Sequence, residues 1–182
     1  MEKEKSVPNN KLTKTIPILS IWKTIKLGDY KHIDDLLASI TQSGMTVGEW
    51  GNHLLTRPDF NLHHELVEIP LVQVNIDELP LREDMYLNDI YSAVIGKSIT
   101  INDTEYEIAL CPNEVGPQLR LQYTDQPKDE LLRIAMDPIK DSVGSIALFR
   151  VENVKSNMLL SGILAESEKL SKGNFIFCLQ KK

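Results

Sequence analysis

The sequence predicts an α+β fold in which an N-terminal strand and helical hairpin and a third helix precede a C-terminal antiparallel meander sheet. Two observations lead to this fold class. Apolar residues recur at helical spacing through much of the first half of the chain, whereas short alternating segments separated by turn residues fill the second half. A chain of 182 residues is also long enough to bury one core without disulfide bonds.

Composition and charge narrow the class of protein. Hydrophobic residues make up 42% and charged residues 25% of the chain, as in a typical globular domain. The net charge of −6 argues against binding to nucleic acid, because phosphate binding requires a basic face. The chain has no apolar run of membrane-spanning length, no N-terminal secretory signal and no Cys-x-x-Cys pair. We therefore expect a cytoplasmic protein that does not contact a membrane, with export by a route that ignores the N-terminus as the alternative.

The N-terminus predicts a flexible tail followed by one domain. Residues 1–15 are polar, show no periodicity and contain the run Pro-Asn-Asn at positions 8–10, so we expect them to stay outside the core. The domain is expected to span residues 16–182. It should begin with a strand over residues 20–27, where β-branched residues dominate.

Two helices are expected next, as a hairpin. Apolar residues of segment 32–43 recur at helical spacing before the terminator Gly44. A second helix is expected over residues 46–57, with Thr46 as its N-cap and Glu49 as the capping-box partner.

The helical hairpin also invites comparison with the helix-turn-helix motif. In that interpretation Glu49, Asn52 and His53 would face the major groove. The second helix carries an acid and no basic residue before Arg57, so it lacks the charge that the phosphate backbone requires. We therefore expect no nucleic-acid partner.

The middle of the chain predicts a strand, a helix and a small hairpin. Segment 65–76 follows a loop and is strand-like, although Pro70 would place it at an edge or a bulge. An amphipathic helix is expected within residues 81–96. Alternating apolar residues around Asn102 and Asp103 predict a small hairpin over residues 98–110 or, alternatively, an insertion before Cys111.

The triplet His63, His64 and Glu65 resembles a metal-binding pattern. Adjacent residues on a strand point to opposite faces, and helical zinc motifs place their histidines four residues apart. No third ligand at a recognised spacing accompanies the triplet. We expect neither a metal nor another cofactor.

The remaining chain predicts short antiparallel strands joined by tight turns. Their apolar faces alternate, and turn residues separate them. The expected strands cover residues 119–124, 131–137, 145–152, 157–165 and 174–180.

Polar chemistry is concentrated in residues 111–127. Pro112 and Pro117 stiffen the first half of this stretch around Glu114, and Gly116 would permit a tight turn there. In the second half, alternation predicts that Leu121 faces the core together with its apolar neighbours, Leu119 and Tyr123. The intervening polar residues, Arg120, Gln122 and Thr124, would then face outward.

We expect this loop and strand to act as a non-catalytic binding module. The candidate ligand-binding residues are Glu114, Gln118, Arg120 and Gln122. Arginine offers a planar fork for a carboxylate, so the partner would be a protein or a small acidic ligand.

Two catalytic alternatives use the same stretch. In a hydrolase or transferase, Glu114 would be the general acid/base, Arg120 the charge stabiliser, and Tyr123 or Gln122 the orienting group. In a thiol enzyme, Cys111 would pair with a histidine, for which the candidates are His53, His63 and His64. The non-catalytic alternative is that Cys111 is a small buried apolar residue.

Residues 110–123 (Leu-Cys-Pro-Asn-Glu-Val-Gly-Pro-Gln-Leu-Arg-Leu-Gln-Tyr), with Asp-Gln-Pro at 125–127 and Ile-Ala-Met-Asp-Pro-Ile at 134–139, resemble a family of short, uncharacterised bacterial proteins. The resemblance covers most of the chain, including residues 22–28, 48–50 and 89–91. It implies a bacterial domain and brings no activity, cofactor or catalytic residue with it.

Overall fold

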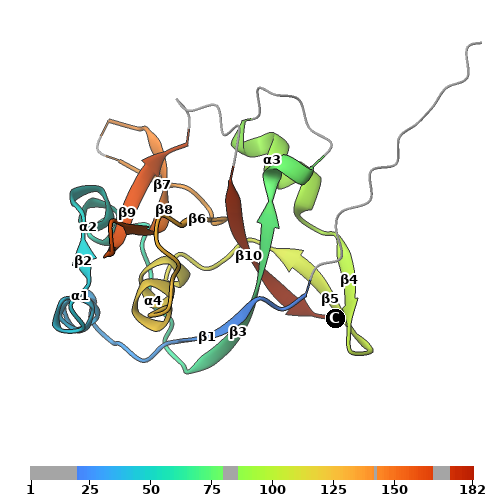
Figure 1. The fold of residues 1–182 in the computed structure, drawn as a ribbon, viewed down its shortest axis with the longest axis horizontal. Helices are drawn as coiled ribbons and strands as arrows, with labels where there is room; N and C mark the ends of the chain where they lie inside the picture. The colour runs from blue at the N-terminus through green and yellow to red at the C-terminus, as the bar shows by residue number, and fades with distance from the viewer. Residues whose placement is uncertain (1–19, 80–85, 142, 166–172) are drawn as a thin grey trace, which may run out of the picture.

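The computed structural model describes residues 20–79, 86–141, 143–165 and 173–182. Within these ranges, four α-helices pack against one large mixed β-sheet, so the expected α+β class is confirmed (Figure 1). The expected tail, residues 1–15, lies outside the described residues. So does the first part of the helix expected within 81–96. No helix of the described ranges is both long and apolar enough to cross a bilayer.

The N-terminal elements include the expected strand and two helices, but an unexpected short strand lies between the helices, which do not form a hairpin. These elements are β1 (Lys23–Leu27), α1 (Ile33–Gln42), β2 (Thr46–Val47) and α2 (Glu49–Leu55). Thr46 and Val47 form a strand that pairs in parallel with β9 (Asn157–Leu164). Thr46 is therefore not the N-cap of α2, a position that Gly48 occupies. The strand also separates α1 from α2, which removes the helix-turn-helix arrangement.

The middle elements form close to the expected segments, although the strand that contains Pro70 is not an edge strand, since it has a partner on each side in the sheet order. These elements are β3 (Val67–Asn75), the short 3₁₀ helix η1 (Ile76–Glu78), α3 (Leu87–Val94), β4 (Ser98–Ile101) and β5 (Thr104–Ala109). Asn102 and Asp103 join β4 to β5 with φ angles of 48° and 60°, as a tight hairpin turn requires. The predicted hairpin is confirmed.

The C-terminal strands form close to the expected bounds, but they do not make a simple meander. They are β6 (Leu131–Ile134), β7 (Ile139–Lys140), β8 (Ile146–Val154), β9 and β10 (Asn174–Lys181). The sheet order is β1-β3-β10-β6-β8-β9-β2, with β5 also paired to β10. The last strand thus lies in the middle of the sheet, antiparallel to β3 and parallel to β6. Local spacing predicts the strands but not these long-range partners.

The expected strand over residues 119–124 is wrong, because this segment belongs to helix α4 (Val115–Gln122). The buried apolar residues Val115, Leu119 and Tyr123 recur every four residues, which is the helical period. Pro117 lies in the first turn, where a missing N–H costs no intrahelical hydrogen bond. Alternation over so short a segment therefore misled the prediction.

Helix α4 packs between strands that lie far apart in the sheet. It contacts β1 at one end of the strand order and β8 and β9 towards the other end (Figure 1). A Cβ atom on Gly116 would lie 2.7 Å from the side chain of Phe149 on β8. Gly116 thus allows the helix to approach the sheet closely and does not form the turn that we expected.

Candidate functional site

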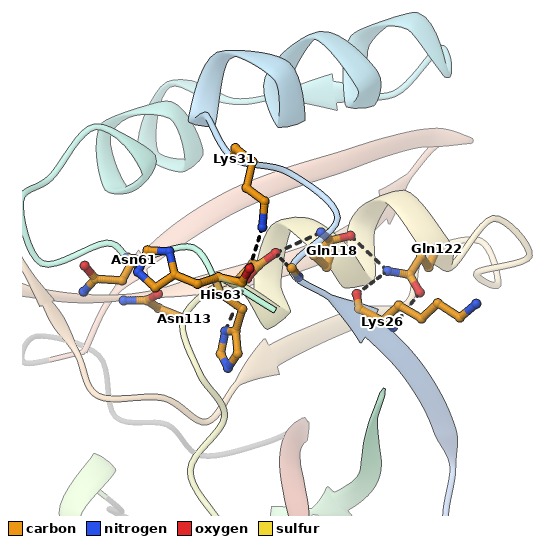
Figure 2. Close-up of polar contacts among 10 residues, drawn as sticks. Lys26, Lys31, Asn61, His63, Asn113, Gln118 and Gln122 are labelled. Carbon is orange, nitrogen blue, oxygen red and sulfur yellow. Dashed lines mark hydrogen bonds and ion pairs between the residues drawn. The ribbon is translucent and has the colours of Figure 1, made fainter. Parts of the chain in front are cut away.

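The carboxylate of Glu114 lies at the centre of the polar contacts made by α4. Glu114 precedes the helix and is 0% exposed. One carboxylate oxygen accepts hydrogen bonds from the main-chain nitrogen of Gly28 at 3.1 Å and from Nε2 of Gln118 at 3.0 Å. The other accepts from the main-chain nitrogen of His63 at 2.6 Å and lies 3.3 Å from His63 Nδ1. A single side chain therefore ties α4 to the end of β1 and to the loop before β3 (Figure 2).

The hydrogen bond from the main chain of residue 28 to Glu114 is possible because residue 28 is a glycine. Gly28 has a φ of +85°, and a Cβ atom there would lie 2.1 Å from the main-chain oxygen of Glu65. No other residue type fits this position without strain. The chain after β1 can thus turn tightly and present its N–H group to Glu114.

Gln118 and Gln122 extend the polar contacts along one face of α4. Positions 114, 118 and 122 are four residues apart, so their side chains follow one another along the helix. Nε2 of Gln122 donates to Oε1 of Gln118 at 2.9 Å and to the main-chain oxygen of Lys26 at 2.8 Å. The main-chain nitrogen of Lys26 donates back to Oε1 of Gln122 at 2.9 Å (Figure 2).

The loop that Glu114 holds contains Asn61, Leu62, His63 and His64, which we call the 61–64 segment. Two further contacts fix its ends. Oδ1 of Asn113 accepts from the main-chain nitrogen of Asn61 at 3.2 Å, and Nζ of Lys31 donates to the main-chain oxygen of His64 (Figure 2). The segment is therefore held at three points by side chains from two other parts of the chain.

The 61–64 segment is the common wall of two surface pockets. The first pocket has a volume of about 490 Å³ and is completed by Cys111, Pro112, Asn113 and Asp137. The second has a volume of about 470 Å³ and is completed by Phe60 and by residues 30–34 at the start of α1. Both volumes fall in the range of small-molecule sites.

Arg120 lies away from these pockets and is not on an outward face. Its side chain is 0% exposed, and its guanidinium donates to Oε1 of Gln126 and to the main-chain oxygens of Tyr123 and Glu152. Burial lowers the pKa of Arg120, although nearby Tyr123 and Glu130 partly offset this effect. The expectation of an exposed guanidinium facing a ligand is thus wrong, because the helix turns this side chain into the core.

Tyr123 is likewise a core residue. It makes an edge-to-face contact with Trp22 at 5.1 Å between ring centroids and is 6% exposed. Burial, together with the charges of Glu130 and Asp125, raises the pKa of Tyr123 to about 12. The phenol is therefore neutral at physiological pH.

Cys111 lines the first pocket together with His63 and His64, but its thiol points to the main chain. Sγ donates to the main-chain oxygen of Ile176 at 3.4 Å. Burial and the adjacent thiol of Cys178 raise the pKa of Cys111 well above its ordinary value. A protonated thiol is a poor nucleophile, so the geometry favours the apolar role of this cysteine. His53, the third histidine considered, lies on α2 against Trp50.

The sequence singled out part of this site and missed the rest. Among the pocket residues it drew attention to Cys111, His63 and His64, the last two as a possible metal pair. The described residues contain no group of three His, Cys, Asp or Glu side chains arranged to hold a metal ion. Lys31, His32 and Asp137 were missed, because each lies in a different segment and no local motif marks it.

Comparisons of the chain with protein-family models, with curated proteins and with solved structures return no match.

Proposed function

We propose that this protein is a non-catalytic binding module whose ligand lies against the 61–64 segment. The observation that carries the proposal is the buried carboxylate of Glu114, which holds this segment between the two pockets. A wall fixed before the ligand arrives loses little conformational freedom on binding, which favours affinity. The first half of the 111–127 stretch takes part directly, since Cys111, Pro112 and Asn113 line the first pocket.

A binding module fits the geometry better than a hydrolase or transferase does. Glu114 has no exposed surface, and three N–H groups occupy its carboxylate. Arg120 is committed to internal acceptors on the other side of α4. Neither side chain can therefore reach a substrate in this conformation, whereas the side chains of Asn61 and His64 are exposed.

The same geometry favours a small ligand over a protein partner. Two pockets of this size suit small molecules, and their walls combine polar and charged side chains with apolar ones. The proposed role of Glu114, Gln118 and Gln122 is to position the binding loop, and the ligand itself meets the 61–64 segment.

A fragment screen by NMR on the full chain tests this proposal. The library should contain neutral, cationic and anionic fragments, and the readout is the shift of assigned backbone amides. We expect hits of at least one charge class to shift the amides of the 61–64 segment and of Asn113. The double variant Asn61→Ala/His64→Ala should lose these shifts, while the control Asn52→Ala, at an exposed position of α2, should retain them. Hits that avoid the segment, or a screen without hits there, would refute the proposal.

A further inference from the structure

The second pocket gathers side chains that can carry positive charge. Lys31, His32, His63 and His64 line it, so three of the four histidines of the chain meet there. We propose that the ligand of this pocket is a small organic anion, and that its affinity rises as the pH falls through the range in which histidines gain a proton. This inference rests on the proposed function, because it assigns a ligand chemistry to the same site.

The charge of the pocket wall depends on pH. With neutral histidines, the positive charge of Lys31 is balanced by the negative charge of Asp34, which lines the same pocket. Protonation of the histidines adds positive charge to this lining. The lining then has a net positive charge and attracts an anion.

His32 and His64 supply most of this pH-dependent attraction. His63 lies 3.3 Å from the carboxylate of Glu114, so a proton on His63 is offset by an internal negative charge. On the opposite side of the 61–64 segment, Asp137 lines the first pocket. An anion is therefore better placed in the second pocket, next to His32 and His64.

Lys31 adds a further positive charge to the lining of the second pocket. Its ammonium donates one hydrogen bond to the main-chain oxygen of His64, which holds the side chain beside the pocket. An ammonium group has three protons, so two are left for a ligand. Because Lys31, His32 and His64 are exposed, salt will screen the attraction.

The apolar part of the wall indicates an organic ligand. Tyr30, Ile33, Phe60 and Leu62 line the same pocket beside the basic groups. A volume of about 470 Å³ exceeds the need of a bare inorganic ion. A carboxylate or similar head group attached to an apolar body satisfies both parts of the lining.

NMR titrations with benzoate test the inference, with benzamide as its neutral analogue and sulfate as a bare anion. Titrations of the full chain at low ionic strength and at about pH 5.5 and about pH 8 separate the charge states of histidine. We expect benzoate to shift the amides of residues 31–34 and 61–64, with an affinity about tenfold higher at the lower pH. Benzamide should bind much more weakly, and sulfate should bind more weakly than benzoate.

Variants identify the responsible groups. His32→Gln/His64→Gln should remove the pH dependence, Lys31→Gln should weaken benzoate at both pH values, and the control His53→Gln should change neither. A pH dependence that survives in the double variant, or no response to benzoate, would overturn the inference. If benzamide binds as well as benzoate, the anion assignment fails but the proposed site stands, so the two failures are distinguishable.

Discussion

The side-chain amide of Gln122 forms two hydrogen bonds with the main chain of Lys26, one from each end of the amide. These are the two main-chain groups, one N–H and one C=O, through which β1 would pair with a further strand on this side. Strand β1 lies at the end of the sheet order and pairs only with β3 among the described strands. Gln122 therefore occupies part of an edge that could otherwise pair with another chain.

Removing this amide should loosen β1. We expect Gln122→Ala to lower the free energy of unfolding by about 1 kcal/mol, because the freed groups of Lys26 can bond to water instead. Hydrogen exchange should show faster exchange at the Lys26 amide. The control Gln180→Ala, at an exposed position of β10, should change neither quantity. An unchanged exchange rate at Lys26 would contradict the proposed role.

Arg120 should matter more for stability than its neighbour Leu121. Arg120→Ala leaves the acceptors on Gln126, Tyr123 and Glu152 unpaired inside the core, so we expect a loss of about 3–5 kcal/mol. Leu121 is only partly buried, so Leu121→Ala should cost about 1 kcal/mol.

Chemical denaturation of the two variants measures the contrast. We expect the larger loss of stability in Arg120→Ala. A strand over residues 119–124 would give the larger loss in Leu121→Ala, since that register would bury Leu121 and expose Arg120. A larger loss in Leu121→Ala than in Arg120→Ala would contradict the helix.

The buried phenol of Tyr123 should make the fold sensitive to alkali. The pKa of Tyr123 is raised from its ordinary value of about 10 to about 12 in the folded protein. Between these values the folded state binds more protons than the unfolded state, so this contribution to stability is lost as the pH rises from about 10 to about 12. The lowered pKa of Arg120 acts in the opposite direction, because there the unfolded state binds more protons.

Comparison with Tyr123→Phe isolates the contribution of the phenol. Thermal melts across the alkaline range should show a smaller loss of stability in the variant than in the wild type. The control Tyr86→Phe, at an exposed tyrosine, should behave as the wild type does. Parallel curves for all three proteins would show that Tyr123 does not titrate as expected.

The strands show which part of the fold the sequence predicts and which part it does not. The strands near β8, β9 and β10 follow from alternation and turn residues, both of which act over a few residues. The insertion of β10 between β3 and β6 depends on partners about a hundred and about forty residues away, which no local pattern records. The fold class was therefore predictable, and the sheet order was not.

The candidate site shows the same limit. Residues 111–127 were recognised as unusual, and Glu114 is indeed where the polar contacts converge. Alternation of Leu119, Leu121 and Tyr123 suggested a strand, although spacing by four was also present. The pocket itself joins residues 30–34 to the 61–64 segment, and only the folded chain brings them together.

The Glu114 carboxylate fixes the 61–64 segment through its hydrogen bond with the main chain of His63. Glu114→Gln tests it most directly, because glutamine keeps the shape but replaces one acceptor oxygen with a donor group that cannot pair with an N–H. Hydrogen exchange of the full chain should show that the amide facing the new NH2 group, Gly28 or His63, exchanges at least about tenfold faster in the variant, with the amides of β8 and β9 unchanged. The control Glu49→Gln, at an exposed position of α2, should exchange as the wild type does. Unchanged exchange at both Gly28 and His63 in Glu114→Gln would show that the carboxylate does not hold the 61–64 segment.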